Sequence, residues 1–286
     1  MPRNAMVISK LWAQASVLTF LLGFTGLGIL AALIYARQPP RPARVLAANG
    51  ESLFTGEDIV AGQQLFQRRE LMQFGTIYGH GAYLGPDFTA QYLHRAASSM
   101  LSFYEQQGAR PDEARAQVVR ESKDNAYDPG TDTLTFTAGQ AHAFQSMRDF
   151  YREYFGPHET QRGLKRPAIA DPGEIHQLTA FFAWAAWTAS ARRPDAPYSY
   201  TNDWPGEPLV GNFPTAENFF WSVVSLISLL AGIGLVLYLF GRYQVLGWHR
   251  ADEQGQCCTH KQTGDNEDGK GKGKSGDCAN QNRMGG

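Results

Sequence analysis

Three cysteines and a histidine near the C-terminus come nearest in type and spacing to a metal site. They are Cys257, Cys258, His260 and Cys278. Thiolate and imidazole ligands suit zinc, but this spacing matches no tetrahedral ligand pattern. We therefore interpret the cysteines as reduced, cytoplasmic thiols and predict no metal centre here.

The histidines of the chain avoid its two long apolar runs, residues 11–36 and 218–241. They are His80, His94, His142, His158, His176, His249 and His260. Neither run contains a carboxylate or a basic side chain. Ionisable residues within a membrane mark reaction and proton paths. We therefore predict no catalytic residues in these two segments.

The two apolar runs are each long enough to cross a hydrocarbon core, which needs about 20 residues. A cleaved signal peptide is the alternative for the first run, but its apolar core should be only roughly 7–15 residues long. We expect an uncleaved anchor at 11–36 and a second span at 217–241. Together they would place the chain in a lipid bilayer as a multi-pass protein.

Two spans place both termini on one side of the membrane and residues 37–216 on the other. Basic residues after the second span favour a cytoplasmic side for residues 1–10 and 242–286, so the large domain is expected to be periplasmic. A third apolar run, 175–191, would reverse this topology if it crossed the membrane. It is short and polar enough that we interpret it as a buried helix.

The domain is predicted to be mainly helical, with helix starts marked by capping residues. Thr55 and Asp58 resemble a capping box that opens a helix through Arg69. Further helices are expected from near Asp87 to Gly108, from Pro111 to about Lys123, from Ala138 to Phe155, and from Pro172 after the cap Asp171. The segment DTLTFT, 132–137, predicts a short strand.

Two stretches beyond these helices differ in character. The segment YSYTNDWPGEPLVGNFPT, 198–215, is either an ordinary connecting loop or a re-entry to the membrane with Tyr198, Tyr200 and Trp204 at the headgroups. Residues 242–286 form a glycine- and lysine-rich tail with almost no apolar side chains. Such a composition cannot compensate for the entropy of ordering, so we expect disorder.

The segment LMQFGTIYGHGAYLGPDF, 71–88, raises the main functional question. Together with FFAWAAWTAS and YTNDWPGEPLVGN, it resembles the N-terminal region of quinol-dependent nitric oxide reductases, single-chain members of the haem-copper oxidase superfamily. The resemblance covers most of residues 10–249. It implies a protein of the bacterial inner membrane whose periplasmic domain is cytochrome c-like and carries no haem of its own.

In relatives that do bind haem, the attachment motif C-x-x-C-H precedes a G-x-G-A-Y element. Here that element is Gly79–Tyr83, which places the attachment motif at residues 71–75. The resemblance thus implies that Leu71, Phe74 and Gly75 replace the two thiols and the haem-ligating histidine. Leu71 and Phe74 are expected to fill the volume that a porphyrin would need.

The resemblance also implies a calcium role for the loop that remains. Gly81 and Tyr83 would supply a backbone carbonyl and a hydroxyl to a calcium ion shared with the haem propionates of a catalytic body. Two oxygen ligands are too few without that partner. The alternative is that Tyr83 is a packed core tyrosine, and His80 is expected to be a surface or loop residue.

The family activity joins two nitric oxide molecules into nitrous oxide and water, with electrons from a membrane quinol. The resemblance assigns it to haem b, haem b3, non-haem iron and calcium in a catalytic body. We predict no catalytic residue or cofactor in this chain. We expect as partner a haem-copper-oxidase-type membrane subunit or a missing continuation of the same chain, and no nucleic acid.

Three explanations stay open for the missing catalytic spans. The chain is a truncated or frameshifted copy, a separate small subunit, or a non-enzymatic membrane-anchored binding or assembly subunit. Recovery of a haem-bearing membrane partner would favour a nitric oxide reductase module, and a colourless protein without one would favour the last.

Overall fold

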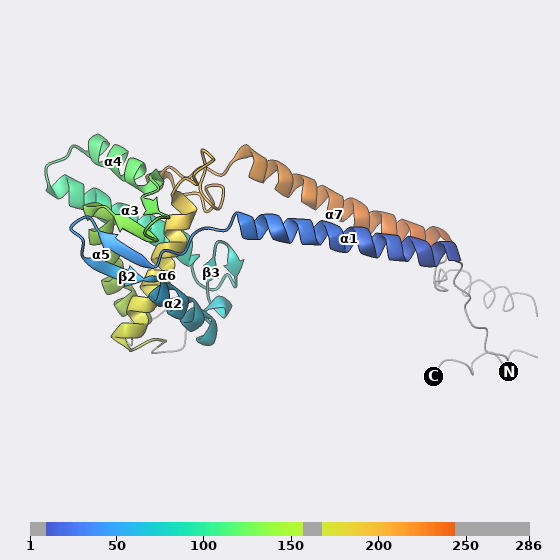
Figure 1. The fold of residues 1–286 in the computed structure, drawn as a ribbon, viewed down its shortest axis with the longest axis horizontal. Helices are drawn as coiled ribbons and strands as arrows, with labels where there is room; N and C mark the ends of the chain where they lie inside the picture. The colour runs from blue at the N-terminus through green and yellow to red at the C-terminus, as the bar shows by residue number, and fades with distance from the viewer. Residues whose placement is uncertain (1–9, 157–167, 244–286) are drawn as a thin grey trace, which may run out of the picture. The chain divides into compact units, whose positions relative to one another are not determined.

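The structure is a computed structural model that describes residues 10–156 and 168–243 (Figure 1). The described residues are mainly helical, with seven α-helices, as the sequence predicts. The predictions for residues 1–9 and for the tail from 244 onward, including its cysteines and His260, lie outside the described residues.

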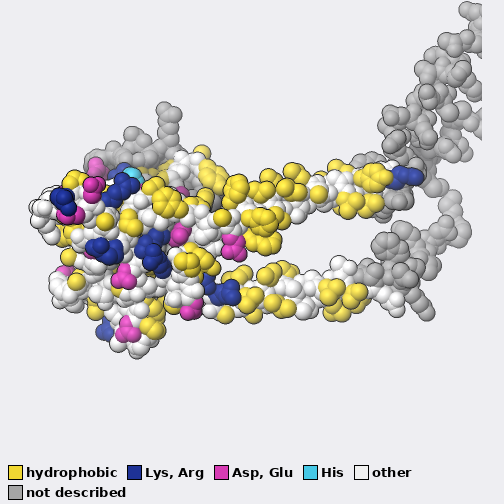
Figure 2. Space-filling model, turned by 90° about the horizontal axis from the view of Figure 1, so that it is seen from above, with side chains coloured by type: hydrophobic (Ala, Val, Ile, Leu, Met, Phe, Trp, Pro, Cys, Tyr) yellow, Lys and Arg dark blue, Asp and Glu magenta, His cyan; other side chains and the backbone are white. Residues whose placement is uncertain are grey.

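Two long apolar helices correspond to the predicted spans. They are α1 (Lys10–Ala36) and α7 (Ala216–Tyr243). Within them, Val17–Ala36 and Ala216–Leu239 are long and apolar enough to cross a membrane, and neither window is buried in the structure. Figure 2 shows hydrophobic side chains along both helices and most of the charged side chains on the domain. This exposure fits helices whose natural solvent is lipid.

Five helices build the domain, and the predicted caps of α2 and α6 are confirmed. Thr55 and Asp58 form the reciprocal capping box of α2, Asp87 caps α3, and Asp171 caps α6. Each cap satisfies backbone N–H groups that have no partner within the helix. The bounds are α2 (Gly56–Arg68), α3 (Phe88–Gln106), α4 (Pro111–Lys123), α5 (Ala138–Phe155) and α6 (Pro172–Ser190).

A small mixed sheet of four strands lies beside these helices. The order is β2 (Ser52–Thr55), β1 (Arg44–Ala47), β6 (Thr133–Phe136) and β5 (Tyr127–Asp128). β1 pairs parallel with β6 and antiparallel with β2, and β5 pairs antiparallel with β6. The strand predicted from DTLTFT is confirmed as β6, whereas the other three strands of the sheet were not predicted.

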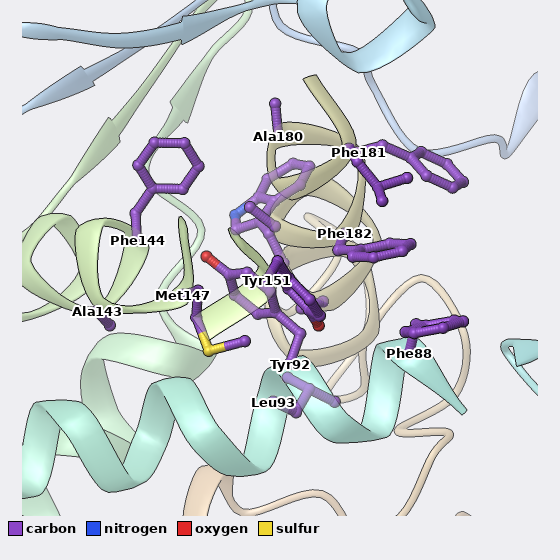
Figure 3. Packing of buried hydrophobic residues seen from close by; sticks show 14 of the residues in the cluster. Phe88, Tyr92, Leu93, Ala143, Phe144, Met147, Tyr151, Ala180, Phe181 and Phe182 are labelled. Atoms are coloured by element: carbon purple, nitrogen blue, oxygen red, sulfur yellow. The ribbon is translucent and has the colours of Figure 1, made fainter. Parts of the chain in front are cut away.

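Helix α6 is the centre of the hydrophobic core. Its buried residues lie on all sides, among them Phe182, Ala185 and Ala189 with no exposed surface. Figure 3 shows Phe182 of α6 facing Phe88 of α3, with Tyr151 and Met147 of α5 beside them. The domain therefore covers this helix, and the prediction of a buried helix rather than a third membrane span is confirmed.

The contact between α2 and α6 depends on a glycine. A Cβ atom at Gly62 would fall on the backbone carbonyl of Gln177 and on the Cβ of Phe181. Because α6 is packed on all sides, it cannot move away to make space for a side chain at this position.

We expect Gly62→Ala to lower the free energy of unfolding by about 1–3 kcal/mol. The neighbouring exposed substitution Gln63→Ala should stay within about 0.5 kcal/mol. Urea unfolding followed by tryptophan fluorescence compares the two, and equal effects would contradict this packing.

Candidate functional site

The segment 71–88 folds into a short helical turn followed by a tight hairpin. The turn is η1 (Leu71–Gln73), and the hairpin pairs β3 (Thr76–Ile77) with β4 (His80–Gly81). Tyr78 and Gly79 connect the two strands, and both have positive φ, 53° and 83°. Two successive residues of positive φ are typical of a type I′ turn, which matches the natural twist of paired strands.

Two glycines of this segment lie where the backbone passes very close to other parts of the same segment. A Cβ atom at Gly81 would lie 2.5 Å from the carbonyl oxygen of Gly75, and Gly81 also has a φ of 140°. A Cβ atom at Gly75 would lie 2.5 Å from the carbonyl oxygen of Pro86 and 2.7 Å from the ring of Phe88. These two positions therefore require glycine for space, and at Gly81 for conformation as well.

The carboxylate of Asp87 holds the hairpin to the start of α3. Its Oδ2 accepts hydrogen bonds from the Thr76 hydroxyl at 2.6 Å and from the Gly79 N–H at 2.5 Å. Its Oδ1 accepts from the Ala90 N–H at 2.9 Å as the helix cap. One side chain thus sets the position of the loop relative to the helix, whereas the sequence predicts only that a helix begins near Asp87.

Tyr78 anchors the hairpin to the central helix. Its hydroxyl donates to the carbonyl oxygen of Ala185 at 3.2 Å and lies 2.5 Å from the hydroxyl of Thr188. Burial raises the pKa of Tyr78 well above its ordinary value, and the negative charge of Asp87 raises it further. The phenol is therefore a neutral anchor across the physiological pH range.

A second loop, residues 199–212, contacts the hairpin and is held by a buried ion pair. The indole N–H of Trp204 donates to the carbonyl oxygen of Tyr78 at 3.2 Å. Lys123 Nζ donates to Asp203 Oδ1 and to Asn212 Oδ1, both at 2.7 Å. Burial lowers the pKa of Lys123, and the Asp203 carboxylate opposes that shift. This network was not predicted, because Lys123 has the position of an ordinary basic residue at a helix end.

Leu71 and Phe74 are both packed into the core. Their exposed fractions are 1% and 3%. The ring centroid of Phe74 lies 6.4 Å from that of Phe88, which stacks on Phe182 with centroids 4.8 Å apart. The region around the predicted attachment motif is therefore filled by side chains.

The residues present do not fit a covalently attached haem. All three cysteines of the chain lie at or beyond residue 257, so residues 71–75 contain no cysteine and no C-x-x-C-H motif. The space beside residues 71–75 is also occupied, because a Cβ atom at Gly75 would already lie 2.7 Å from the ring of Phe88. We therefore derive no step through a haem bound in this domain.

The tip of the loop is exposed, which corrects one alternative from the sequence. Tyr83 is 85% exposed, so it is not a packed core tyrosine, and its hydroxyl donates to the carbonyl oxygen of Gly79 at 3.3 Å. His80 is exposed as predicted. No cluster of three or more metal-ligating side chains occurs among residues 10–156 and 168–243. Whether Gly81 and Tyr83 share a calcium ion stays a prediction.

Four exposed apolar side chains lie on this loop and on its neighbour. We call Met72, Tyr83, Leu84 and Trp204 the apolar loop patch. Their exposed fractions are 44%, 85%, 70% and 46%. The backbone beneath them is tied together, because the Ala82 N–H donates to the Met72 carbonyl at 2.8 Å and Trp204 donates to Tyr78. Grouped apolar exposure on a rigid support is typical of an interaction site.

The fold and this loop define a mainly helical domain that lies in sequence between two helices of membrane-spanning length. Residues 42–206, more than half of the chain, match the family of NorB cytochrome c-like domains of nitric oxide reductase, and the chain belongs to this family. The resemblance to nitric oxide reductases is confirmed at this level. No curated protein matches the chain.

Proposed function

We propose that the chain is the membrane-anchored, haem-free cytochrome c-like module of a quinol-dependent nitric oxide reductase. Its domain caps the periplasmic face of a catalytic body in which quinol electrons reduce two nitric oxide molecules, with two protons, to nitrous oxide and water. The body is either a separate haem-copper-oxidase-type subunit or a continuation of the same chain.

The apolar loop patch is the observation that carries this proposal. In a cytochrome c that transfers electrons, the corresponding loop surrounds a haem. Here Leu71 and Phe74 fill the core beneath the loop, and Tyr83 and Leu84 project outward from it. A loop that is packed inside and apolar outside is suited to docking on another surface rather than to electron transfer.

Calcium would act at the same contact. The Gly81 carbonyl and the Tyr83 hydroxyl are two oxygen ligands of the kind that a hard cation prefers, and Ca²⁺ takes about 6–8. The remaining oxygens would come from the catalytic body and its haem propionates. The exposure of Tyr83 supports this proposal, because its hydroxyl is accessible to a partner.

A co-purification experiment tests the proposal. We expect the tagged chain, isolated in mild detergent from its native membrane, to bring with it a polypeptide that carries haem b. The double variant Tyr83→Ser/Leu84→Ser should lose that polypeptide. Its own stability should change by no more than about 0.5 kcal/mol, since both side chains are exposed.

Tyr83→Phe is the matched control. It keeps the ring and removes the hydroxyl, so we expect it to retain the haem-bearing partner while weakening the effect of added calcium on the complex. Recovery of a stable, colourless chain with no haem-bearing partner would instead favour a non-enzymatic binding or assembly role. Full co-purification with the double variant would exclude the patch as the contact.

A further inference from the structure

A basic groove lies at the C-terminal end of α4, away from the apolar loop patch in sequence and unused by the proposed function. It measures about 740 Å³. Its walls come from α4 and from the turn after α6. The ionisable side chains that line it are Arg120, Lys123, Asp124, Arg192 and Arg193.

The charges of this groove are unbalanced. Lys123 is neutralised by its ion pair with Asp203, 2.7 Å away. The three arginines make no ion pair with any residue that the structure describes, which leaves three guanidinium groups against the single lining carboxylate of Asp124. The guanidinium of Arg193 lies over the ring of Tyr198, 5.8 Å from its centroid, a contact that does not neutralise its charge. Asp195 lies on the same turn as Arg193, without an ion pair to it in the described structure. The whole chain has a net charge of -1, so this concentration of positive charge is local.

The backbone that carries the arginines is held in place. The side-chain amide of Asn125 donates to the Arg192 carbonyl at 2.8 Å, and the Arg192 N–H donates to the Lys123 carbonyl at 3.1 Å. Burial is the main cause of the lowered pKa of Lys123, and the positive charge of Arg192 lowers it further. The fold thus keeps like charges close together although their repulsion disfavours it.

We infer that this groove binds a phosphate group, presented either by an anionic lipid or by a soluble phosphate. Guanidinium groups offer pairs of N–H donors that match the oxygens of phosphate, and several of them around one groove suit a group of high charge and many acceptors. A ligand with a single carboxylate would form a bidentate pair with only one of the three guanidinium groups.

Titration calorimetry on the full chain in zwitterionic detergent tests this inference. The probes are inorganic phosphate and a short-chain phosphatidylglycerol below its micelle concentration. We expect saturable binding that weakens as salt is raised. The variant Arg120→Gln/Arg192→Gln/Arg193→Gln should bind at least about tenfold more weakly, since charged hydrogen bonds are lost. Tighter binding of the lipid identifies a membrane headgroup as the source, and equal binding identifies a soluble phosphate.

The control removes three exposed arginines elsewhere, Arg68→Gln/Arg115→Gln/Arg152→Gln, and should bind like the unaltered chain. The inference is overturned by any of three results: no binding of either probe, equal loss in the control, or equal competition by chloride at the same ionic strength. Co-purification with a haem-bearing partner should be unaffected by the groove variant. The two proposals therefore fail or hold separately.

Discussion

Lys123→Met is expected to lower the free energy of unfolding by about 3–5 kcal/mol, because it leaves a buried charge without its partner. The side chains of Lys123 and Asp203 are only 8% and 13% exposed, and Lys123 also donates to Asn212. After the substitution, the Asp203 carboxylate loses its ion-pair partner and keeps one hydrogen bond, from the Ser199 N–H at 3.1 Å. Urea unfolding of the chain in detergent, followed by tryptophan fluorescence, measures the loss.

The double variant Lys123→Met/Asp203→Asn separates charge from packing. Asparagine retains an oxygen for the Ser199 N–H and tolerates the positive φ of 59° at this position. We expect it to recover at least about 1 kcal/mol of the loss, because the orphaned charge is gone. A loss below about 1 kcal/mol in the single variant, or no recovery in the double one, would show that the pair is not buried as described.

Phe88→Ala is expected to cost about 3–5 kcal/mol as well, by opening a cavity at the centre of the core. Phe88 has no exposed surface, and five other aromatic rings have their centroids within 6.4 Å of its own. The neighbouring elements are fixed by their caps and hydrogen bonds, so they are poorly able to close over the space. The same urea titration compares the variant with the unaltered chain.

Phe103→Ala on the same helix is the control for Phe88→Ala. Phe103 is only partly buried and packs against Tyr104 and His142. It should cost less than about 2 kcal/mol, since full burial of such a side chain contributes about 1.5–3 kcal/mol. Equal costs at the two positions would mean that the core around Phe88 is not tightly packed.

Local sequence signals were sufficient to predict the helices. Thr55 with Asp58, Pro111, and Asp171 with Pro172 act through contacts within one turn, so they are legible in sequence and recur in the structure. In α5, the spacing of Phe144, Met147 and Tyr151 places them on one face of the helix, and the structure buries all three.

Features that depend on distant partners were not predictable from local patterns. β1 has only four residues and gains its place by pairing with β6, about 90 residues further along the chain. Tyr78 has a positive φ, which tyrosine rarely adopts. In this conformation its hydroxyl donates a hydrogen bond to the Ala185 carbonyl of α6, which is distant in sequence. Lys123 binds Asp203 and Asn212, which lie 80 and 89 residues further along the chain. No local pattern around Lys123 indicates these partners.

The candidate site was predicted in part. The burial of Leu71 and Phe74 agrees with the expectation that they fill space, and their equivalence to haem-attachment positions stays a prediction from the resemblance. The sequence did not decide whether Tyr83 is buried or exposed, because it lies in a loop without the hydrophobic periodicity of a helix or strand. Only the fold shows that it projects outward beside Leu84.

A haem assay on the purified chain tests the central claim most directly. The chain would be produced in a host with an active cytochrome c maturation system, separated on a denaturing gel and examined for haem-dependent peroxidase activity and for a pyridine haemochrome spectrum. A domain with Leu71 and Phe74 packed in its core should carry no covalent haem in either assay. One covalent haem for each chain would contradict the account.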